Sequence, residues 1–209
     1  MTRPVLFLLA DNDLQEACIG CFVERKDWAS SFGCTPITIE RSDLIVPAGE
    51  KDPGLFARAP DLARPYLRTH EHLLVVLDAA WAGSPGAQRI EEQLGEKLAR
   101  NGWSNERAAV VVIEPELEVW AWSDRRALAR ALYVELPTPA RPRVPDILAE
   151  WGRDAARGPK ERLEALREKL AIPTSSAQFR RFAAAARIER CEDRGFARLR
   201  DLFRRWFPA

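Results

Sequence analysis

The chain has 209 residues, of which 46% are hydrophobic and 30% are charged, and its formal net charge is +1. This composition is typical of a folded globular protein and excludes an intrinsically disordered chain. The near-neutral balance predicts no particular partner, but residues 151–209 hold 15 Lys and Arg against 8 Asp and Glu. That basic end could contact phosphates or an acidic partner, or could simply form solvated helix surfaces.

Four segments are expected to form strands. Three are continuous apolar runs, as in strands buried on both faces of a parallel sheet, and one alternates β-branched residues. In chain order they are residues 5–9, 36–40, 73–77 and 108–113. Amphipathic helical patterns separate most of them, so we expect an α/β fold with a mainly parallel sheet flanked by helices.

Prolines divide the rest of the chain. Region 42–71 contains four and is the least regular part, although a helix over 55–67 fits its pattern. A connection this long usually serves as a lid or a binding loop. We expect an α/β domain over 1–134, a Pro-rich connector over 135–146, and an all-helical C-terminal segment over 147–209 that packs on the domain.

The first apolar run ends before Asp11 and is too short for a signal peptide or a membrane span. We therefore expect a cytoplasmic protein without membrane partners. Its four cysteines are then expected to be free thiols rather than a disulfide framework.

Carboxylates follow three of the expected strands. Asp11 comes after the first, Asp78 after the third, and Glu114 after the fourth, with Glu116 and Glu118 close behind. In a parallel α/β sheet these positions meet at one edge, where ligands bind. Clustered carboxylates are ligands for Mg²⁺ or Mn²⁺, which could activate water for phosphodiester cleavage. Alternatively, each acid caps a turn or sits in the first turn of a helix, where the dipole favours it.

The sequence around these acids resembles TOPRIM-like proteins. Residues 110–120 read VVVIEPELEVW, ending near Asp124, and are similar to the Pro-Glu-x-Glu-x-Trp signature of the DUF4276 and RloB type found among restriction and phage-defence genes. Residues 175–179 and 191–196 resemble the helical C-terminal segments of those proteins. The chain is also similar to the small TOPRIM-like component of methylation-associated phage-defence systems.

The resemblance implies a TOPRIM-like fold and two alternative functions. One is an accessory or binding component of a prokaryotic anti-phage defence system, which binds other defence proteins, DNA or RNA. The other is a Mg²⁺- or Mn²⁺-dependent nuclease. The implied metal ligands are Asp11, Asp78, Glu114 and Glu118, and Asp78 and Glu118 would be the catalytic pair.

The chain departs from the TOPRIM pattern at two places. The usual Glu-Gly pair after the first strand is Asp11-Asn12, and the usual Asp-x-Asp is Asp78-Ala79-Ala80. The second aspartate of the metal-binding pair is therefore missing. This loss favours a degenerate metal site and the accessory function over the nuclease.

Six arginines in the basic end are candidates for binding nucleic acid or a partner protein. The alternative is a solvated helix face. They are Arg180, Arg181, Arg187, Arg194, Arg198 and Arg205.

Two smaller patterns have competing interpretations. Cys18 and Cys21 form a Cys-x-x-Cys pair, which is more typical here of small core residues than of redox or zinc chemistry. His70 and His72 share one side of an expected strand and could converge on a metal ion, but an exposed polar start to the strand is the favoured interpretation.

Overall fold

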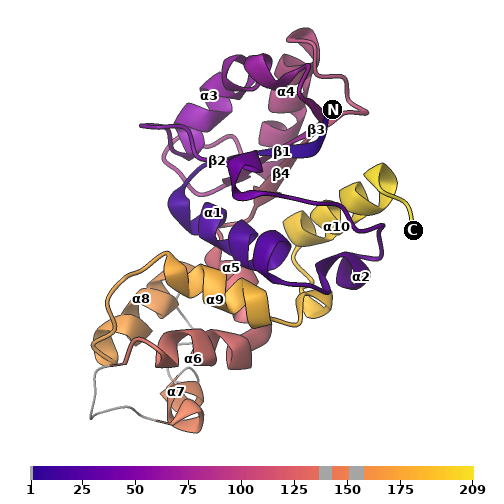
Figure 1. Cartoon of the computed structure of the whole chain (residues 1–209). Helices are drawn as coiled ribbons and strands as arrows, with labels where there is room; N and C mark the ends of the chain where they lie inside the picture. The colour runs from indigo at the N-terminus through magenta and orange to yellow at the C-terminus, as the bar shows by residue number, and fades with distance from the viewer. Residues whose placement is uncertain (1, 137–142, 151–157) are drawn as a thin grey trace.

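The computed structural model describes residues 2–136, 143–150 and 158–209. Their sheet has four parallel strands in the order β2-β1-β3-β4. The expected α/β class with a parallel sheet and a helical C-terminal segment is thereby confirmed (Figure 1). The strands are β1 (Arg3–Leu9), β2 (Leu44–Ile45), β3 (His70–Asp78) and β4 (Ala108–Ile113).

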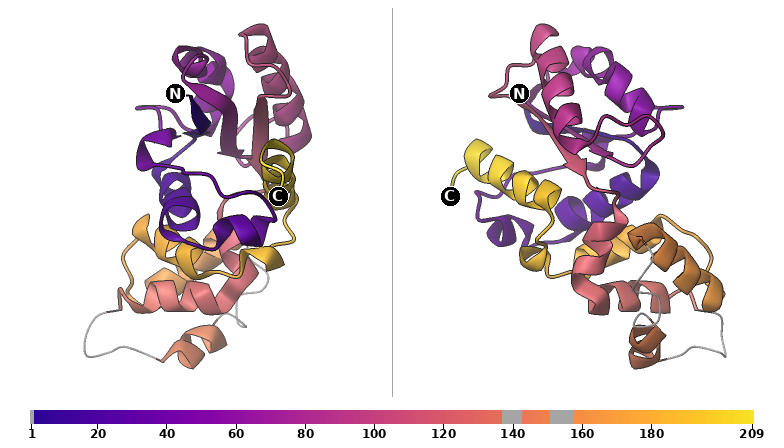
Figure 2. Two further views of the ribbon diagram at one scale, coloured as in Figure 1. Left: turned by 45° about the vertical axis from the view of Figure 1, so that its right-hand side comes forward. Right: turned by 180° about the vertical axis from the view of Figure 1, so that it is seen from behind.

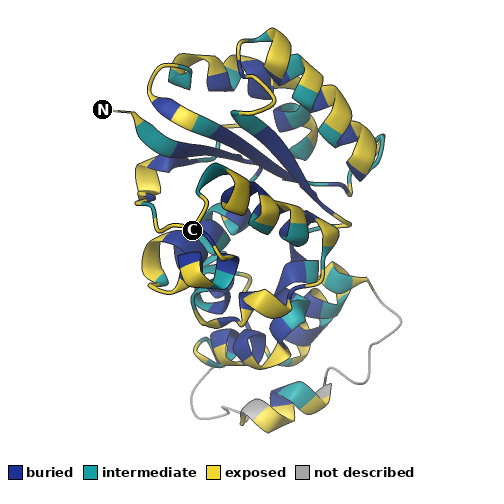
Figure 3. Ribbon diagram, turned by 90° about the vertical axis from the view of Figure 1, so that its right-hand side faces the viewer, coloured by how far each residue is buried: buried dark blue, intermediate teal, exposed yellow. Residues whose placement is uncertain are grey.

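Helices cover both faces of the sheet. α3 and α4 contact each other and the strands on one face, while α1 and α10 contact the strands on the other (Figure 3). The strands are almost entirely buried between these layers, which explains their continuous apolar runs. The helices in this part are α1 (Asn12–Cys18), α2 (Trp28–Phe32), α3 (Asp52–Ala63), α4 (Ala87–Arg100) and α10 (Arg194–Trp206).

The other helices gather beyond the carboxyl ends of the strands (Figure 2). Among them, α9 contacts α1 and α6, α8 contacts α5, and α7 contacts α6. They are α5 (Glu118–Ala121), α6 (Arg125–Tyr133), α7 (Val144–Glu150), α8 (Pro159–Lys169) and α9 (Ala177–Ala185). Half of the predicted connector, 137–142, lies outside the described residues, and its last three residues belong to α7. No described helix is long and apolar enough to cross a bilayer.

Aromatic rings join the sheet to the C-terminal helix. Phe22 stacks on Phe203 of α10 with ring centroids 5.3 Å apart, and Phe7 of β1 lies 5.3 Å from the Phe22 ring. On β4, the edge strand, Arg198 Nε donates a hydrogen bond of 2.9 Å to the Val110 carbonyl. The end of the chain is thus integrated with the sheet, and α10 covers part of its open edge.

The strand predicted over 36–40 is wrong. Residues 35–40 form no strand, and the edge position beside β1 is taken by Leu44 and Ile45. Pro36 has no amide to donate to a sheet, and the preceding Thr35 N–H donates instead to the Phe207 carbonyl at 2.9 Å. The segment is therefore held by the C-terminus rather than by a neighbouring strand.

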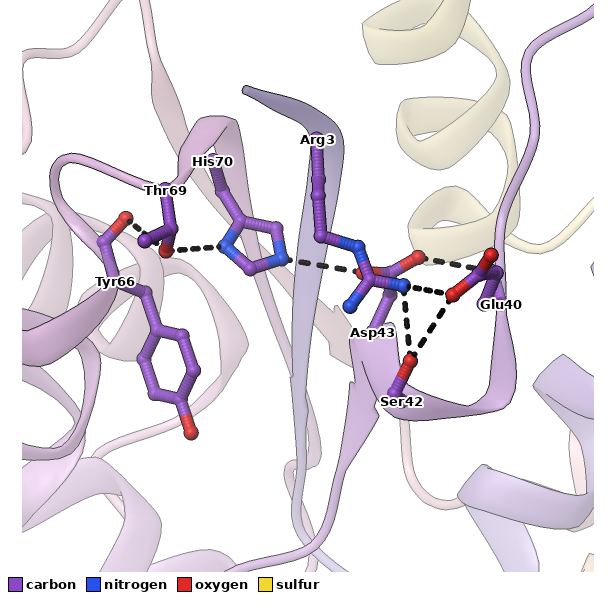
Figure 4. Close-up of polar contacts among 7 residues, drawn as sticks. All are labelled: Arg3, Glu40, Ser42, Asp43, Tyr66, Thr69 and His70. Carbon is purple, nitrogen blue, oxygen red and sulfur yellow. Dashed lines mark hydrogen bonds and ion pairs between the residues drawn. The ribbon is translucent and has the colours of Figure 1, made fainter. Parts of the chain in front are cut away.

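A polar network centred on the buried Asp43 and His70 joins the amino ends of the strands (Figure 4). Asp43 Oδ1 lies 2.7 Å from Arg3 Nε and 3.1 Å from His70 Nε2, and Asp43 Oδ2 accepts the Glu40 amide at 2.9 Å. Thr69 Oγ1 lies 3.0 Å from the other ring nitrogen of His70. His70 is thus buried and bonded, so the favoured expectation of an exposed strand start is wrong for this residue.

His72 does not join His70 in a metal site. Its ring stacks on Trp206 of α10, with centroids 4.5 Å apart. Burial lowers the pKa of His72, which is consistent with a neutral ring in an aromatic contact. Both histidines therefore support the fold at the amino ends of the strands, away from the carboxylates at the carboxyl ends.

Candidate acidic site

The parallel register places the ends of β1 and β3 side by side. Leu9 pairs with Val76, so Asp11 and Asp78, each two residues further along, leave the sheet at the same edge. Asp11 Oδ1 accepts the Leu14 amide at 2.8 Å and caps α1, as the capping alternative predicts. Burial, followed by the charges of Asp13 and Asp52, raises the pKa of Asp11.

Asp78 is the centre of this group. Its Oδ1 is buried and finds no hydrogen-bond partner in the described part of the chain. Burial raises the pKa of Asp78 well above its ordinary value, and the charges of Asp52, Asp11 and Glu118 raise it further. A backbone hydrogen bond from Leu117 acts in the opposite direction. A buried carboxyl among like charges is costly to ionise, so the surroundings of Asp78 favour a proton or a nearby cation.

Asp52 is a member of the group that sequence reasoning missed. It is the first residue of α3, and its Oδ1 accepts the Asp78 backbone amide at 2.7 Å. Burial raises the pKa of Asp52 as well, against the lowering effect of that hydrogen bond. Lys51-Asp52-Pro53 is a typical helix start, and this sequence could have predicted that Asp52 begins a helix.

Glu118 enters the group from the segment after β4. It begins α5 and is only 7% exposed. Burial raises its pKa to about 7, with a further contribution from Glu116. Glu116 Oε2 in turn lies 3.6 Å from Lys160 Nζ of α8. Asp11, Asp52, Asp78 and Glu118 are called the acidic edge below.

Glu114 lies apart from the acidic edge. It is exposed and borders a surface depression together with Gln88 and Arg89 of α4 and Arg194 of α10. The structure thus brings together three of the four predicted metal ligands, Asp11, Asp78 and Glu118, and adds Asp52.

Backbone hydrogen bonds hold the turn that lacks the second aspartate. The amides of Ala79 and Ala80 both donate to the Pro115 carbonyl, at 3.1 and 3.0 Å. The turn after Asp78 is therefore fixed against the segment after β4. It carries no second carboxylate toward the acidic edge.

The acidic edge fits a hard cation by donor type but not by placement. Carboxylate oxygens are the ligands that Mg²⁺ and Mn²⁺ prefer. Within residues 2–136, 143–150 and 158–209, however, no three histidine, cysteine or carboxylate side chains lie close enough together to hold a metal ion. Asp11 and Asp52 each use an oxygen to bind a backbone amide. As placed, the residues do not form the predicted metal centre.

The six candidate arginines do not form one free basic patch. On α9, Arg180 Nε lies 3.2 Å from Glu16 Oε2, and Arg181 pairs with Glu135. Arg187 Nε lies 3.2 Å from Asp124, which also caps α6. These three arginines are therefore largely neutralised by acids of neighbouring helices.

The three candidate arginines on α10 lie near α4 and β4. Arg194 lies 2.6 Å and Arg198 3.7 Å from Glu91. Arg205 is exposed and makes no ion pair within the described residues. Of the six, Arg205 is the one best placed to meet an external anion.

Cys18 and Cys21 are buried, as are the other two cysteines, and all four are free thiols. Burial raises the pKa of both, that of Cys21 to about 12, so neither is a reactive thiolate at neutral pH. They line a small apolar cavity between the sheet and α9. The core interpretation of this pair is confirmed.

The fold and the acidic edge define a parallel α/β protein with carboxylates gathered at the carboxyl ends of its strands. No protein-family model matches the chain, and no curated protein matches it. Among solved structures, it is similar to the C-terminal region of the Burkholderia pseudomallei OLD protein, with 17% identity, a TM-score of 0.49 and coverage of 96% of each chain.

Proposed function

We propose that this chain is an accessory or binding component of a prokaryotic anti-phage defence system, and that its acidic edge is a degenerate metal site. The resemblance of residues 110–120 and of the helical C-terminal segment to TOPRIM-like defence proteins supports the assignment to a defence system. The observation that carries the degenerate site is the turn after Asp78. There, Ala80 stands where the pattern has its second aspartate, and the amides of Ala79 and Ala80 both donate to the Pro115 carbonyl.

The partners in this proposal are other proteins of the same system, or nucleic acid, met through the basic helical end. Intramolecular ion pairs of Arg180, Arg181 and Arg187 favour a protein partner over a nucleic-acid backbone. A backbone would need several free cations along one face. Arg205 and the half-paired Arg198 are the side chains we expect to contribute most.

A phage plating assay tests the defence role. Cells carrying the gene with its chromosomal neighbours should plate phage poorly, and deletion of this gene alone should restore plating. An Asp78→Ala variant should still protect, because the accessory role does not require cleavage. Full plating efficiency with the intact gene set would contradict the proposal.

The alternative function is a Mg²⁺- or Mn²⁺-dependent nuclease. The orphaned Oδ1 of Asp78 and the added carboxylate of Asp52 favour this second candidate. Purified protein is mixed with either metal and with plasmid or linear DNA, beside Asp78→Ala and, as a matched control, Glu114→Ala. We expect no cleavage by any of the three. Cleavage by wild type and Glu114→Ala, but not by Asp78→Ala, would replace the accessory proposal by the nuclease.

A further inference from the structure

A lysine of α8 lies beside the acidic edge. Lys160 Nζ lies 3.6 Å from Glu116 Oε2, and its charge acts on Asp52, Asp78 and Glu118 as well. These carboxyls come from three separate segments of the α/β part. Lys160 is therefore shared by groups that otherwise repel one another. The buried Arg167 guanidinium of the same helix acts on Glu118 as well.

Contacts with Trp122 hold the first turn of α8, which carries Lys160, beside α5. Trp122 Nε1, just after α5, donates a hydrogen bond of 2.8 Å to the Pro159 carbonyl. The Arg162 guanidinium lies over the Trp122 ring, 4.2 Å from its centroid. Lys160 stands between these two contacts in the sequence, so its position follows from how α8 is anchored beside α5.

We infer that Lys160 is the resident counter-cation of the acidic edge and takes the electrostatic place of a divalent metal ion. The observations are its contact with Glu116, the anchored turn of α8, and the buried Asp78 oxygen without a partner among the described residues. The inference concerns the same site and rests on the proposal that the site is a degenerate metal centre. It is independent of which defence proteins the chain binds.

An ordinary surface ion pair is the competing explanation, because the Lys160 side chain is 51% exposed. Such a pair contributes little to stability, and its loss would not affect groups beyond Glu116. A counter-cation differs in one measurable way. Its removal leaves several carboxylates uncompensated, and these then attract an external cation.

The test compares the full chain with Lys160→Met, Lys160→Arg and Lys26→Met. The last variant removes the charge of an exposed lysine elsewhere and is the matched control. Mn²⁺ is titrated by calorimetry at neutral pH, and thermal unfolding is followed with and without Mn²⁺. We expect Lys160→Met to bind Mn²⁺ about tenfold more tightly than wild type or more, and to gain thermal stability from Mn²⁺. Lys160→Arg and Lys26→Met should behave as wild type.

Equal Mn²⁺ affinity in Lys160→Met and wild type would overturn the inference, as would an equal gain in Lys26→Met. Neither result would affect the accessory role. Conversely, full phage plating on cells with the intact gene set would overturn the accessory role, while a gain of Mn²⁺ affinity confined to Lys160→Met would still establish the counter-cation. The two failures therefore have different readouts.

Discussion

Asp52 Oδ1 accepts the backbone amide of Asp78 at 2.7 Å, across a separation of 26 residues. This bond sets a second carboxylate beside Asp78 in a chain that lacks the second aspartate of the Asp-x-Asp pattern. It also fixes the start of α3 against the end of β3. Asp52 therefore has two separable effects, a structural hydrogen bond and an electrostatic repulsion.

Two substitutions separate these effects. Asp52→Asn keeps the acceptor oxygen and removes the charge, whereas Asp52→Ala leaves the Asp78 amide unpaired. We expect Asp52→Ala to lower the free energy of unfolding by about 1–2 kcal/mol relative to Asp52→Asn, as measured by urea denaturation at neutral pH. Equal stabilities of the two variants would show that the bond contributes nothing.

Glu118 predicts a particular dependence of stability on pH. Its pKa is raised from 4.5 to about 7 in the folded chain. The protonated side chain therefore makes its full contribution to the free energy of unfolding below pH 4.5, and this contribution is lost as the pH rises through 7. Denaturation between these pH values should show wild type losing about 2 kcal/mol more than Glu118→Gln. Glu114→Gln, which changes an exposed acid set apart from the acidic edge, is the control and should follow wild type. A wild-type curve parallel to that of Glu118→Gln would contradict the buried, proton-binding role.

Gly20 allows α9 to approach the helix that follows β1. A Cβ at this position would collide with the Arg180 carbonyl and lie 3.1 Å from the Ala184 amide. Gly20→Ala should therefore destabilise the protein by about 1–3 kcal/mol in a chemical denaturation experiment. Gly95→Ala is the matched control because nothing lies within 4 Å of its added Cβ. In a helix interior it should stabilise the protein by up to about 1 kcal/mol.

Asp43 should be the most sensitive polar residue at the amino ends of the strands. Only 1% of it is exposed, and its removal leaves His70, Arg3 and the Glu40 amide without their shared acceptor. We expect Asp43→Ala to cost about 3–5 kcal/mol in thermal or urea unfolding. Glu40→Ala removes an exposed acidic partner of Arg3 and should cost less than about 1 kcal/mol. Similar losses of stability in both variants would indicate that the buried Asp43 contributes no more than an exposed partner of Arg3.

The sequence predicted the buried strands well and the edge strand poorly. Strands β1, β3 and β4 are covered on both faces, so their residues had to be continuously apolar, and that pattern is visible without a structure. The fourth prediction relied on alternation in 36–40, which a local proline and the contact of Thr35 with Phe207 override. Such a long-range contact leaves no periodic signal in the sequence.

The acidic edge was predictable only in part, for a similar reason. Asp11 and Asp78 end neighbouring strands, so a parallel sheet alone brings them together. Asp52 and Lys160 arrive through the packing of α3 and α8, and each stands at the start of a helix with an adjacent proline. Glu114 was expected at the same edge because it follows β4, but it lies beside α4 and Arg194 instead.

The most direct test of the degenerate site is calorimetric titration of the wild-type chain with Mn²⁺ at neutral pH, beside Asp78→Asn. If the acidic edge is no longer a metal centre, wild type and Asp78→Asn should give the same weak heats, without a stoichiometric endpoint. Stoichiometric Mn²⁺ binding by wild type that Asp78→Asn abolishes would contradict this account and establish a working metal site.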